Sequence, residues 1–313
     1  MNSEELHTLI SRWSEELGFL AYGSTPYRTM EMERFDEYLS KGYNAGMDYL
    51  VRNREIRRDP ALLLPGLVSV LCFLAPYKQA RSRKDGAPLI ASYALGKDYH
   101  GVIKEKLRVI LKLICETVPG AEGRVFTDSA PILEREWAAS AGLGFIGKNN
   151  FLISKKHGLH TLIGIILLNI QVHYTTAKVK EGCGSCERCL KSCPTEALCA
   201  PRMLNSGKCI SYQTIESKKR YFQEEEQIDR SGWIFGCDIC LEACPWAKKG
   251  GRQEWEEFMP VEHPLLPGGI MQSNSEDWLE MEKETFLEVF KDSPLRRAGF
   301  EKIKDNLEAN IVR

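Results

Sequence analysis

The sequence predicts a mixed α/β domain that is followed by a smaller domain organised around metal. Segments with helical periodicity alternate with short apolar, strand-like segments from the N-terminus to about residue 172. After that point nine of the eleven cysteines fall between residues 183 and 244, among short segments rich in turns. We therefore expect a first domain over residues 1–172, a second over 173–255 and a helical extension over 256–313.

Helical periodicity marks two long segments of the first domain. Residues 3–17 carry apolar side chains at i, i+3, i+4 and i+7, which predicts an amphipathic helix. Residues 101–118 have the same 3.6-residue period. A further helix is expected at 130–144, where glycines close it, and the extension is expected to be helical over 275–290.

Short apolar runs predict the strands between these helices. The run at 68–75 follows Pro65-Gly66 and has the character of a buried strand. The run at 124–131 is expected to end as a strand at Asp128. Residues 145–153 predict a loop that enters another strand, and residues 160–170 predict the next one.

The composition is that of a globular enzyme without a membrane segment. Hydrophobic residues make up 43% of the chain and charged residues 27%. No apolar run reaches the ~18 residues that a membrane helix needs, and the charged N-terminus lacks the apolar core of a signal peptide. We therefore expect a cytoplasmic protein. The net charge of −1 predicts no general attraction to nucleic acid, so any RNA contact must come from local basic patches.

The clustered cysteines are expected to be metal ligands, because cytosolic thiols are kept reduced. Residues 183–194 have the spacing C-x2-C-x2-C-x3-C-P of bacterial ferredoxins. In that pattern three thiolates hold one [4Fe–4S] cluster and the fourth reaches a neighbouring cluster. By pseudo-symmetry Cys244, which precedes Pro245, crosses back to the first cluster. The first cluster is therefore expected on Cys183, Cys186, Cys189 and Cys244.

The second cluster has three evident ligands, Cys193, Cys237 and Cys240, and needs a fourth. Cys199 and Cys209 are the candidates. Cys199 follows a short apolar turn and has the character of a small buried hydrophobe, so we predict Cys209. Two structural zinc sites are the alternative, since zinc also accepts four thiolates, but the triple spacing followed by proline favours iron–sulfur clusters. An electron carrier alone would not need the roughly 170 residues in front of the cysteines.

A nicotinamide site of the Rossmann type is not supported. No glycine-rich motif follows a strand and opens a helix in the first domain. The glycines of residues 142–147 come closest to the pattern, but they end a helix.

Six segments occur in the same order in a known family. They are "RRDPALLLPG" (57–66), "YALGKDYH" (93–100), "DSAPILEREWAASAGLGFIGKNNFLI" (128–153), "CGSCERCLKSCPTEAL" (183–198), "CISYQTIE" (209–216) and "FGCDICLEACPW" (235–246). In these segments the chain resembles the epoxyqueuosine reductases, which modify tRNA. The resemblance covers about residues 5–250. It implies an α/β (α+β) cobalamin-binding domain followed by a ferredoxin-like domain with two [4Fe–4S] clusters.

The resemblance also implies a reaction. The epoxide oxygen of epoxyqueuosine, at the wobble position of a tRNA anticodon loop, is removed by reduction and queuosine remains, the last step of queuosine biosynthesis. An external low-potential donor supplies electrons, the clusters pass them singly to cobalt, and no protein histidine binds the cobalt. A monomer is expected. A corrinoid reductase of a small molecule, similar to reductive dehalogenases, and a non-catalytic electron-transfer module are the alternatives.

Asp128 matches the catalytic acid of the family. A free Asp titrates near 4, so proton donation at neutral pH would need its pKa raised by the apolar corrin face. The alternative for Asp128 is a helix N-cap, because Pro131 and Glu134 follow it as in a first helical turn.

The remaining cofactor contacts transfer residue by residue from the resemblance. The residues implied to face cobalamin, besides Asp128, are Arg57, Leu152, Ile163, Ser211 and Asp238. A solvated charge, plain core strands and a cap of the cysteine turn are the alternatives for these positions. The chain departs from the usual family residues at Ile165, Gln213 and Ala247, so fine substrate contacts do not transfer at these three positions.

Two short basic patches are the candidate RNA contacts. One holds Lys218, Lys219 and Arg220 beside aromatic residues, and the other holds Lys248 and Lys249. Basic side chains attract phosphate and aromatic rings stack on unpaired bases. We expect both patches to flank the site and receive the anticodon loop, although a solvated face is the commoner meaning of such runs.

Overall fold

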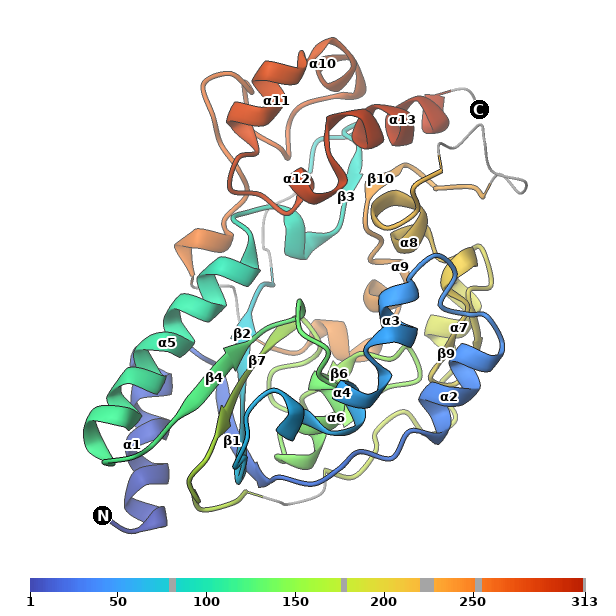
Figure 1. Cartoon of the computed structure of the whole chain (residues 1–313). Helices are drawn as coiled ribbons and strands as arrows, with labels where there is room; N and C mark the ends of the chain where they lie inside the picture. Colours follow the sequence, from blue (N-terminus) through green and yellow to red (C-terminus); the bar gives the residue numbers. More distant parts are fainter. Residues whose placement is uncertain (79–82, 176–178, 220–227, 251–254, 312–313) are drawn as a thin grey trace.

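The computed structural model describes residues 1–78, 83–175, 179–219, 228–250 and 255–311 (Figure 1). A four-stranded sheet lies at the centre of the first half of the chain. Its order is β1-β2-β7-β4, with β1 (Ala21–Pro26), β2 (Ser69–Pro76), β4 (Gly123–Phe126) and β7 (Thr161–Leu168). Every pairing in it is antiparallel, which makes this part of the chain α+β in type.

Helices cover both faces of the sheet. On one face, α1 (Ser3–Glu16) and α5 (Tyr99–Thr117) share a core with Leu71 and Phe73 of β2. On the other face, α6 (Glu134–Ser140) brings Trp137 against Cys72. Successive side chains of a strand point to opposite faces, so β2 contributes to both cores. This double burial explains why β2 is buried along its whole length and is apolar after Ser69.

The structure confirms most of the expected elements. The helices expected at 3–17, 101–118 and 130–144 correspond to α1, α5 and α6, and the strands at 68–75 and 160–170 to β2 and β7. The strand expected to end at Asp128 ends at Phe126 instead, because Asp128 has a φ of 54°, which no extended strand accommodates.

Several elements of the first half were not expected from the sequence. They are β1, the three short helices α2 (Glu33–Ser40), α3 (Asp48–Arg52) and α4 (Arg54–Arg58), and the two-residue strand β3 (Leu89–Ile90). The loop expected at 145–153 is a small hairpin of β5 (Phe145–Ile146) and β6 (Leu152–Ile153).

The cysteine-rich part consists of short elements, as expected. These are α7 (Arg188–Ser192), β8 (Leu198–Ala200), β9 (Met203–Leu204), α8 (Ile210–Ile215), β10 (Trp233–Phe235) and α9 (Ile239–Glu242). Single 3₁₀ turns occur at Pro60–Leu62, Ser92–Ala94, Ser206–Lys208, Pro245–Lys248 and Glu256–Phe258. β10 pairs in parallel with β3, which ties the cysteine-rich part to the first half of the chain.

The C-terminal segment packs over the paired strands β3 and β10. It contains α10 (Ser275–Glu280), α11 (Lys283–Val289), α12 (Leu295–Ala298) and α13 (Phe300–Ile311), which lie beside β3 and β10 in Figure 1. Its buried side chains form one core with Ile90 and Phe235. The division of the chain at residues 172 and 255 stays a prediction. The core under α1 and α5 contains Leu241 and Trp255 as well, so this core includes residues from beyond position 172. Among the described residues no helix is long and apolar enough to cross a membrane.

Candidate active site and metal centres

A cavity of about 620 Å³ lies between the ends of β4 and β7, the hairpin β5–β6 and the helices α2 to α4. Four of the residues implied by the family resemblance line it: Arg57, Asp128, Leu152 and Ile163. Ser211 and Asp238 are not among its lining residues. The Oδ2 atom of Asp238 instead accepts hydrogen bonds from the amide and the hydroxyl of Ser92, at 2.7 Å each. Polar and aromatic side chains from distant segments thus meet in one hollow.

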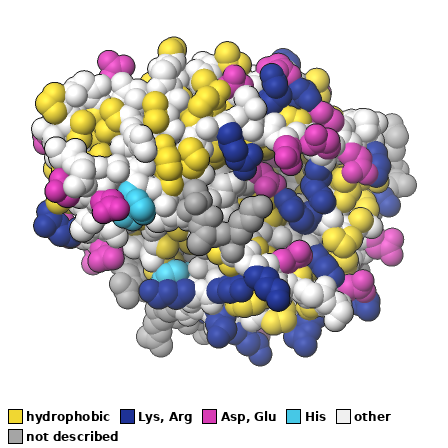
Figure 2. All heavy atoms as spheres, turned by 90° about the horizontal axis from the view of Figure 1, so that it is seen from below, with side chains coloured by type: hydrophobic (Ala, Val, Ile, Leu, Met, Phe, Trp, Pro, Cys, Tyr) yellow, Lys and Arg dark blue, Asp and Glu magenta, His cyan; other side chains and the backbone are white. Residues whose placement is uncertain are grey.

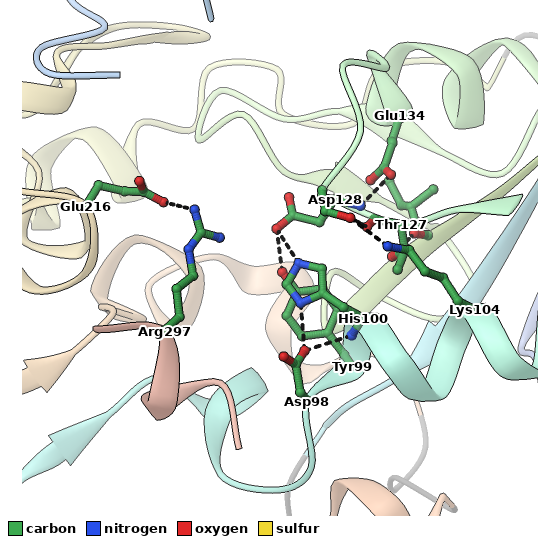
Figure 3. Close-up of polar contacts among 11 residues, drawn as sticks. Asp98, Tyr99, His100, Lys104, Thr127, Asp128, Glu134, Glu216 and Arg297 are labelled. Carbon is green, nitrogen blue, oxygen red and sulfur yellow. Dashed lines mark hydrogen bonds and ion pairs between the residues drawn. The ribbon is translucent and has the colours of Figure 1, made fainter. Parts of the chain in front are cut away.

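Asp128 is the best-connected carboxylate of this cavity (Figure 3). Its Oδ2 accepts a hydrogen bond from the Tyr99 hydroxyl at 2.6 Å and lies 3.2 Å from His100 Nε2. Its backbone N–H donates to Glu134 Oε1 at 2.6 Å. These contacts hold the residue in its left-handed conformation, which an Asp tolerates better than most residues.

The helix-cap alternative for Asp128 is wrong. α6 begins at Glu134, its N-cap residue is Leu133, and no side chain caps it. The Asp128 side chain points to α5 instead, because its hydrogen-bonding partners Tyr99 and His100 stand at the first two positions of that helix.

The expectation of a raised pKa at Asp128 is also corrected. Burial, the strongest influence, does raise the pKa, but hydrogen bonds from His100 and Tyr99 and the charge of Arg297 bring it down to about 2. The side chain is 54% accessible because it faces the cavity, although the surrounding protein desolvates it. In the structure Asp128 is therefore a carboxylate at neutral pH, and a proton must come from a neighbour.

Two neighbours hold that proton. His100 stands between carboxylates, with Nδ1 2.6 Å from Asp98 Oδ1. Burial lowers the pKa of His100, but Asp128 and Asp98 raise it to about 9. Burial and then the charge of Asp128 raise the pKa of Glu134 to about 8. At neutral pH both groups are protonated and both touch Asp128.

A cation from the C-terminal segment completes this electrostatic arrangement. Arg297 of α12 forms an ion pair with Glu216, which follows α8, and its guanidinium extends toward the Asp128 side of the site (Figure 3). The sequence analysis missed Arg297, Tyr99, His100 and Glu134. For Tyr99 and His100 the available signal is an Asp directly before a helix that begins with Tyr-His. For Arg297 the sequence holds no local signal.

The cavity also has polar groups that the described residues leave only partly paired or unpaired. Arg57 is 8% exposed, and no described carboxylate pairs with it; its guanidinium donates to Asn53 O at 3.4 Å and lies over the ring of Phe35. Within the described residues the buried hydroxyl of Thr161 has no hydrogen-bonding partner. A buried cation and an unpaired hydroxyl suit a bound group with an apolar face and polar edges. This hollow therefore fits a large cofactor such as a corrin.

A second cavity, of about 310 Å³, is lined by the four cysteines expected to hold the first cluster: Cys183, Cys186, Cys189 and Cys244. No group of three or more described His, Cys, Asp or Glu side chains converges closely enough to hold a single metal ion. Four thiols around a hollow of this size suit a multi-iron cube better than one zinc ion.

The second set of cysteines lies next to the first. Burial, and then the neighbouring thiols Cys209 and Cys193, raise the pKa of Cys237 to about 12. The pKa of Cys240 is also raised, first by burial and then by Cys237, Cys209, Cys193 and Cys189. Cys209 is therefore a near neighbour of Cys237 and Cys240, and its role as the fourth ligand of the second cluster stays a prediction. Cys199 is exposed and its thiol faces Ala197 O at 3.4 Å.

The predicted RNA contacts lie in two separate places. Lys218 and Lys219 are exposed and follow Glu216, the partner of Arg297, whereas Arg220 lies outside the described residues. Lys249 lines the first cluster cavity, and Lys248 beside it is exposed.

The positions that depart from the family have structural roles here. Ile165 is fully buried in the core beneath α6. Gln213 is buried and donates to Gly207 O at 2.7 Å, while its Oε1 atom has no partner among the described residues. Ala247 lies in the turn after Cys244.

Two family models match the chain. One, an epoxyqueuosine reductase model (QueG, DUF1730), matches residues 57–129, and the other, a 4Fe-4S double cluster binding domain, matches residues 182–247. The epoxyqueuosine reductase of Cyclobacterium marinum is 36% identical over 312 residues, which cover 98% of this chain and 97% of the relative. The enzyme of Escherichia coli is 32% identical over 306 residues, 96% of this chain and 79% of the relative.

The solved structures agree with these matches. An epoxyqueuosine reductase crystallised with an epoxyqueuosine-modified stem loop of tyrosine tRNA has a TM-score of 0.86 at 25% identity, covering 99% of this chain and 82% of that one. A catabolic reductive dehalogenase has a TM-score of 0.52 at 12% identity, covering 80% and 33%, a likeness of fold alone.

Proposed function

The chain belongs to the epoxyqueuosine reductase family, and on this basis we propose that it reduces epoxyqueuosine in tRNA to queuosine. The observation that carries the proposal is the likeness, over almost the whole chain, to a reductase crystallised with an epoxyqueuosine-modified stem loop. The site supports the proposal, because proton donors line a cavity that lies near a second cavity lined by four cysteines.

The reaction sets what the site must supply. Removing the epoxide oxygen and restoring a carbon–carbon double bond consumes two electrons and two protons and releases one water. The two iron–sulfur clusters carry electrons one at a time. The protons must come from side chains or water, since a leaving oxygen without a proton would depart as a strong base.

We assign the proton chemistry to Asp128 and His100. Asp128 lines the cavity and is ionised, while His100 is protonated and 3.2 Å away. As negative charge develops on the epoxide oxygen, Asp128 passes to it a proton that His100 supplies. Glu134, whose side chain accepts from the Asp128 amide, holds a further proton. A positioned acid of this kind typically contributes about 10²–10⁴ in rate.

The corrin belongs to the proposal as well. Arg57, Leu152 and Ile163 line the cavity and would hold it, and the unpaired Thr161 hydroxyl and the Arg57 guanidinium would meet its polar edge. Bound cobalamin would supply a cobalt centre that accepts single electrons at low potential. Ser211 and Asp238, implied by the resemblance, stay proposed contacts whose side chains lie outside the lining of this cavity.

The RNA contacts and the assembly are proposals too. We place the anticodon loop near Lys218, Lys219 and Arg220, because the first two follow the Glu216–Arg297 pair beside the cavity. An unpaired wobble base can enter a deep site without the cost of opening a duplex. The monomer, the cytoplasmic location and the low-potential donor remain predictions.

Anaerobic reconstitution tests the function. The protein is loaded with iron, sulfide and cobalamin and is then incubated with a low-potential reductant and epoxyqueuosine-containing tRNA. The tRNA is digested, and the masses of its nucleosides are measured by mass spectrometry. Loss of one oxygen from the modified nucleoside supports the proposal, and omission of cobalamin is the control. An unchanged nucleoside in fully loaded protein, together with dehalogenation of a halogenated phenol, would favour the small-molecule alternative.

A further inference from the structure

The hairpin β5–β6 separates the two cavities. Leu152 lines the large cavity and its neighbour Ile153 lines the cluster cavity, because successive side chains of a strand point to opposite faces. The loop of the hairpin also faces both cavities. Lys148 and Asn149 line the cluster cavity, and Asn150 and Phe151 line the large cavity. The thiols of the first set therefore open on a different side of the hairpin from the substrate cavity.

The rim of the cluster cavity is basic. Lys148, Arg188 and Lys249 line it, no Asp or Glu does, and no described carboxylate pairs with these three cations. Lys78 adds a fourth charge, since its Nζ donates to Lys249 O at 3.1 Å. Although the net charge of the chain is −1, its cations are unevenly placed, and Figure 2 shows Lys and Arg gathered in a band on one face.

The rim also offers apolar area. Pro245 is exposed and Trp246 is half-buried, with its ring against Phe145 at 5.8 Å between centroids. Cys183 and Cys186 are both partly exposed at the same opening. A small apolar contact surrounded by charges of one sign is the usual form of a weak, transient redox interface.

We propose that this rim docks an acidic, one-electron carrier protein that feeds the first cluster. The inference rests on the proposed function, which needs two electrons per turnover. Each encounter oxidises one carrier by one electron and reduces the cluster by one, so two carriers are consumed for each epoxide reduced. Positive charge on the rim attracts the carrier and orients it with its own redox centre toward Cys183 and Cys186.

The geometry favours a protein over RNA at this surface. The tRNA base must reach the large cavity, which lies on the opposite side of the hairpin from Lys148. Lys249, which the sequence predicts as a tRNA contact, lies on the carrier side. RNA binding at this rim is the competing outcome that the experiment distinguishes.

The test uses fully reconstituted protein and two reductants. An acidic plant-type ferredoxin is the protein probe, and photoreduced deazariboflavin is a small uncharged one. In the variant that combines Lys148→Glu and Arg188→Glu we expect KM and Kd for ferredoxin to rise about ten-fold at low ionic strength. The rate with deazariboflavin should change less than about two-fold, and the salt dependence of ferredoxin binding should largely disappear. Kd is measured by calorimetry, and iron content verifies that both clusters are present.

A matched control and four outcomes decide between the proposals. Lys112→Glu reverses an exposed charge on α5 and should leave ferredoxin binding unchanged. Unaltered ferredoxin binding in the double variant overturns the proposal, and so does an equal loss with both reductants, which would mean that the charges act on the cluster itself. If Lys249→Glu raises KM for tRNA with either reductant and not Kd for ferredoxin, the rim is an RNA surface. Failure of the wild-type protein to convert tRNA with deazariboflavin would instead reject the proposed function.

Discussion

His100 Nε2 lies 3.2 Å from Asp128 Oδ2, and the same carboxylate oxygen accepts the Tyr99 hydroxyl at 2.6 Å. This pairing reverses the simplest idea of a catalytic Asp, in which an apolar surrounding keeps the acid protonated. Here the carboxylate stays charged and the imidazole stores the proton. The site thus behaves as a coupled pair, and its behaviour with pH belongs to the pair more than to either residue.

The pair predicts how the rate depends on pH. Because the pKa of His100 is raised to about 9, the proton supply is complete at neutral pH and is lost as the pH rises through about 9. The groups that face the imidazole are Asp98, Asp128 and Tyr99. Replacement of His100 by Gln should lower kcat about 10²-fold and abolish the fall in rate near pH 9. Single-turnover rates between pH 6 and about 10 measure both effects.

The same pair predicts a stability effect with a defined sign. The folded-state pKa of His100 is above its ordinary value of 6.5, so its contribution is complete below that value and is lost as the pH rises through about 9. The difference in Tm between the wild type and His100→Gln should therefore be constant near pH 6 and should shrink toward pH 9. A difference that grows with pH would contradict the assignment of a protonated His100.

Arg297, from the C-terminal segment, is predicted to lower the pKa of Asp128. Its charge lowers the pKa of Asp128, so Arg297→Gln should raise that pKa and move the acidic limb of the rate profile to higher pH. Arg297→Lys keeps the charge and should restore most of the wild-type profile. An identical loss in both variants, with no movement of the limb, would point to a structural role for the Glu216 ion pair.

How much of this could be predicted from the sequence depended on whether the signal was local. The periodicity of α1 and α5 and the apolar runs of β2 and β7 identify these elements, because each buries a continuous face. The short helices α2 to α4 have no such face, and α2 and α3 bury no residue fully.

The site residues likewise divide into those with a local signal in the sequence and those without one. Cysteine spacing is a local signal, and it leads to the two sets of thiols that the structure brings together. The contact between Asp128 and His100 joins residues that are 28 apart in sequence, and the Arg297–Glu216 pair joins residues 81 apart. Only the fold creates these contacts. The lowered pKa of Asp128 could therefore not be predicted from its neighbours in the chain.

Trp137 is predicted to stabilise the position of α6, the helix whose first turn lines the cavity. Its side chain is fully buried between α6 and the sheet, and α6 follows directly on the segment that carries Asp128. Trp137→Ala should lower the free energy of unfolding by about 3–5 kcal/mol, because a large core side chain leaves a cavity when removed. Val109→Ala, at a position of α5 that is 46% exposed, is the control and should change stability by less than about 0.5 kcal/mol. Denaturant unfolding of both variants under anaerobic conditions measures the difference.

The last prediction concerns the eighth cluster ligand. Cys209 precedes α8 and shares its surroundings with Cys193 and Cys237, whereas Cys199 is exposed on β8. Cys209→Ser should therefore lose about half of the bound iron on anaerobic reconstitution, since one of two four-iron clusters loses a thiolate. Cys199→Ser is the matched control and should keep the full iron content and the full electron paramagnetic resonance signal. The reverse result, with iron lost at Cys199 and kept at Cys209, would remove Cys209 from the second cluster and require a different path for the chain around it.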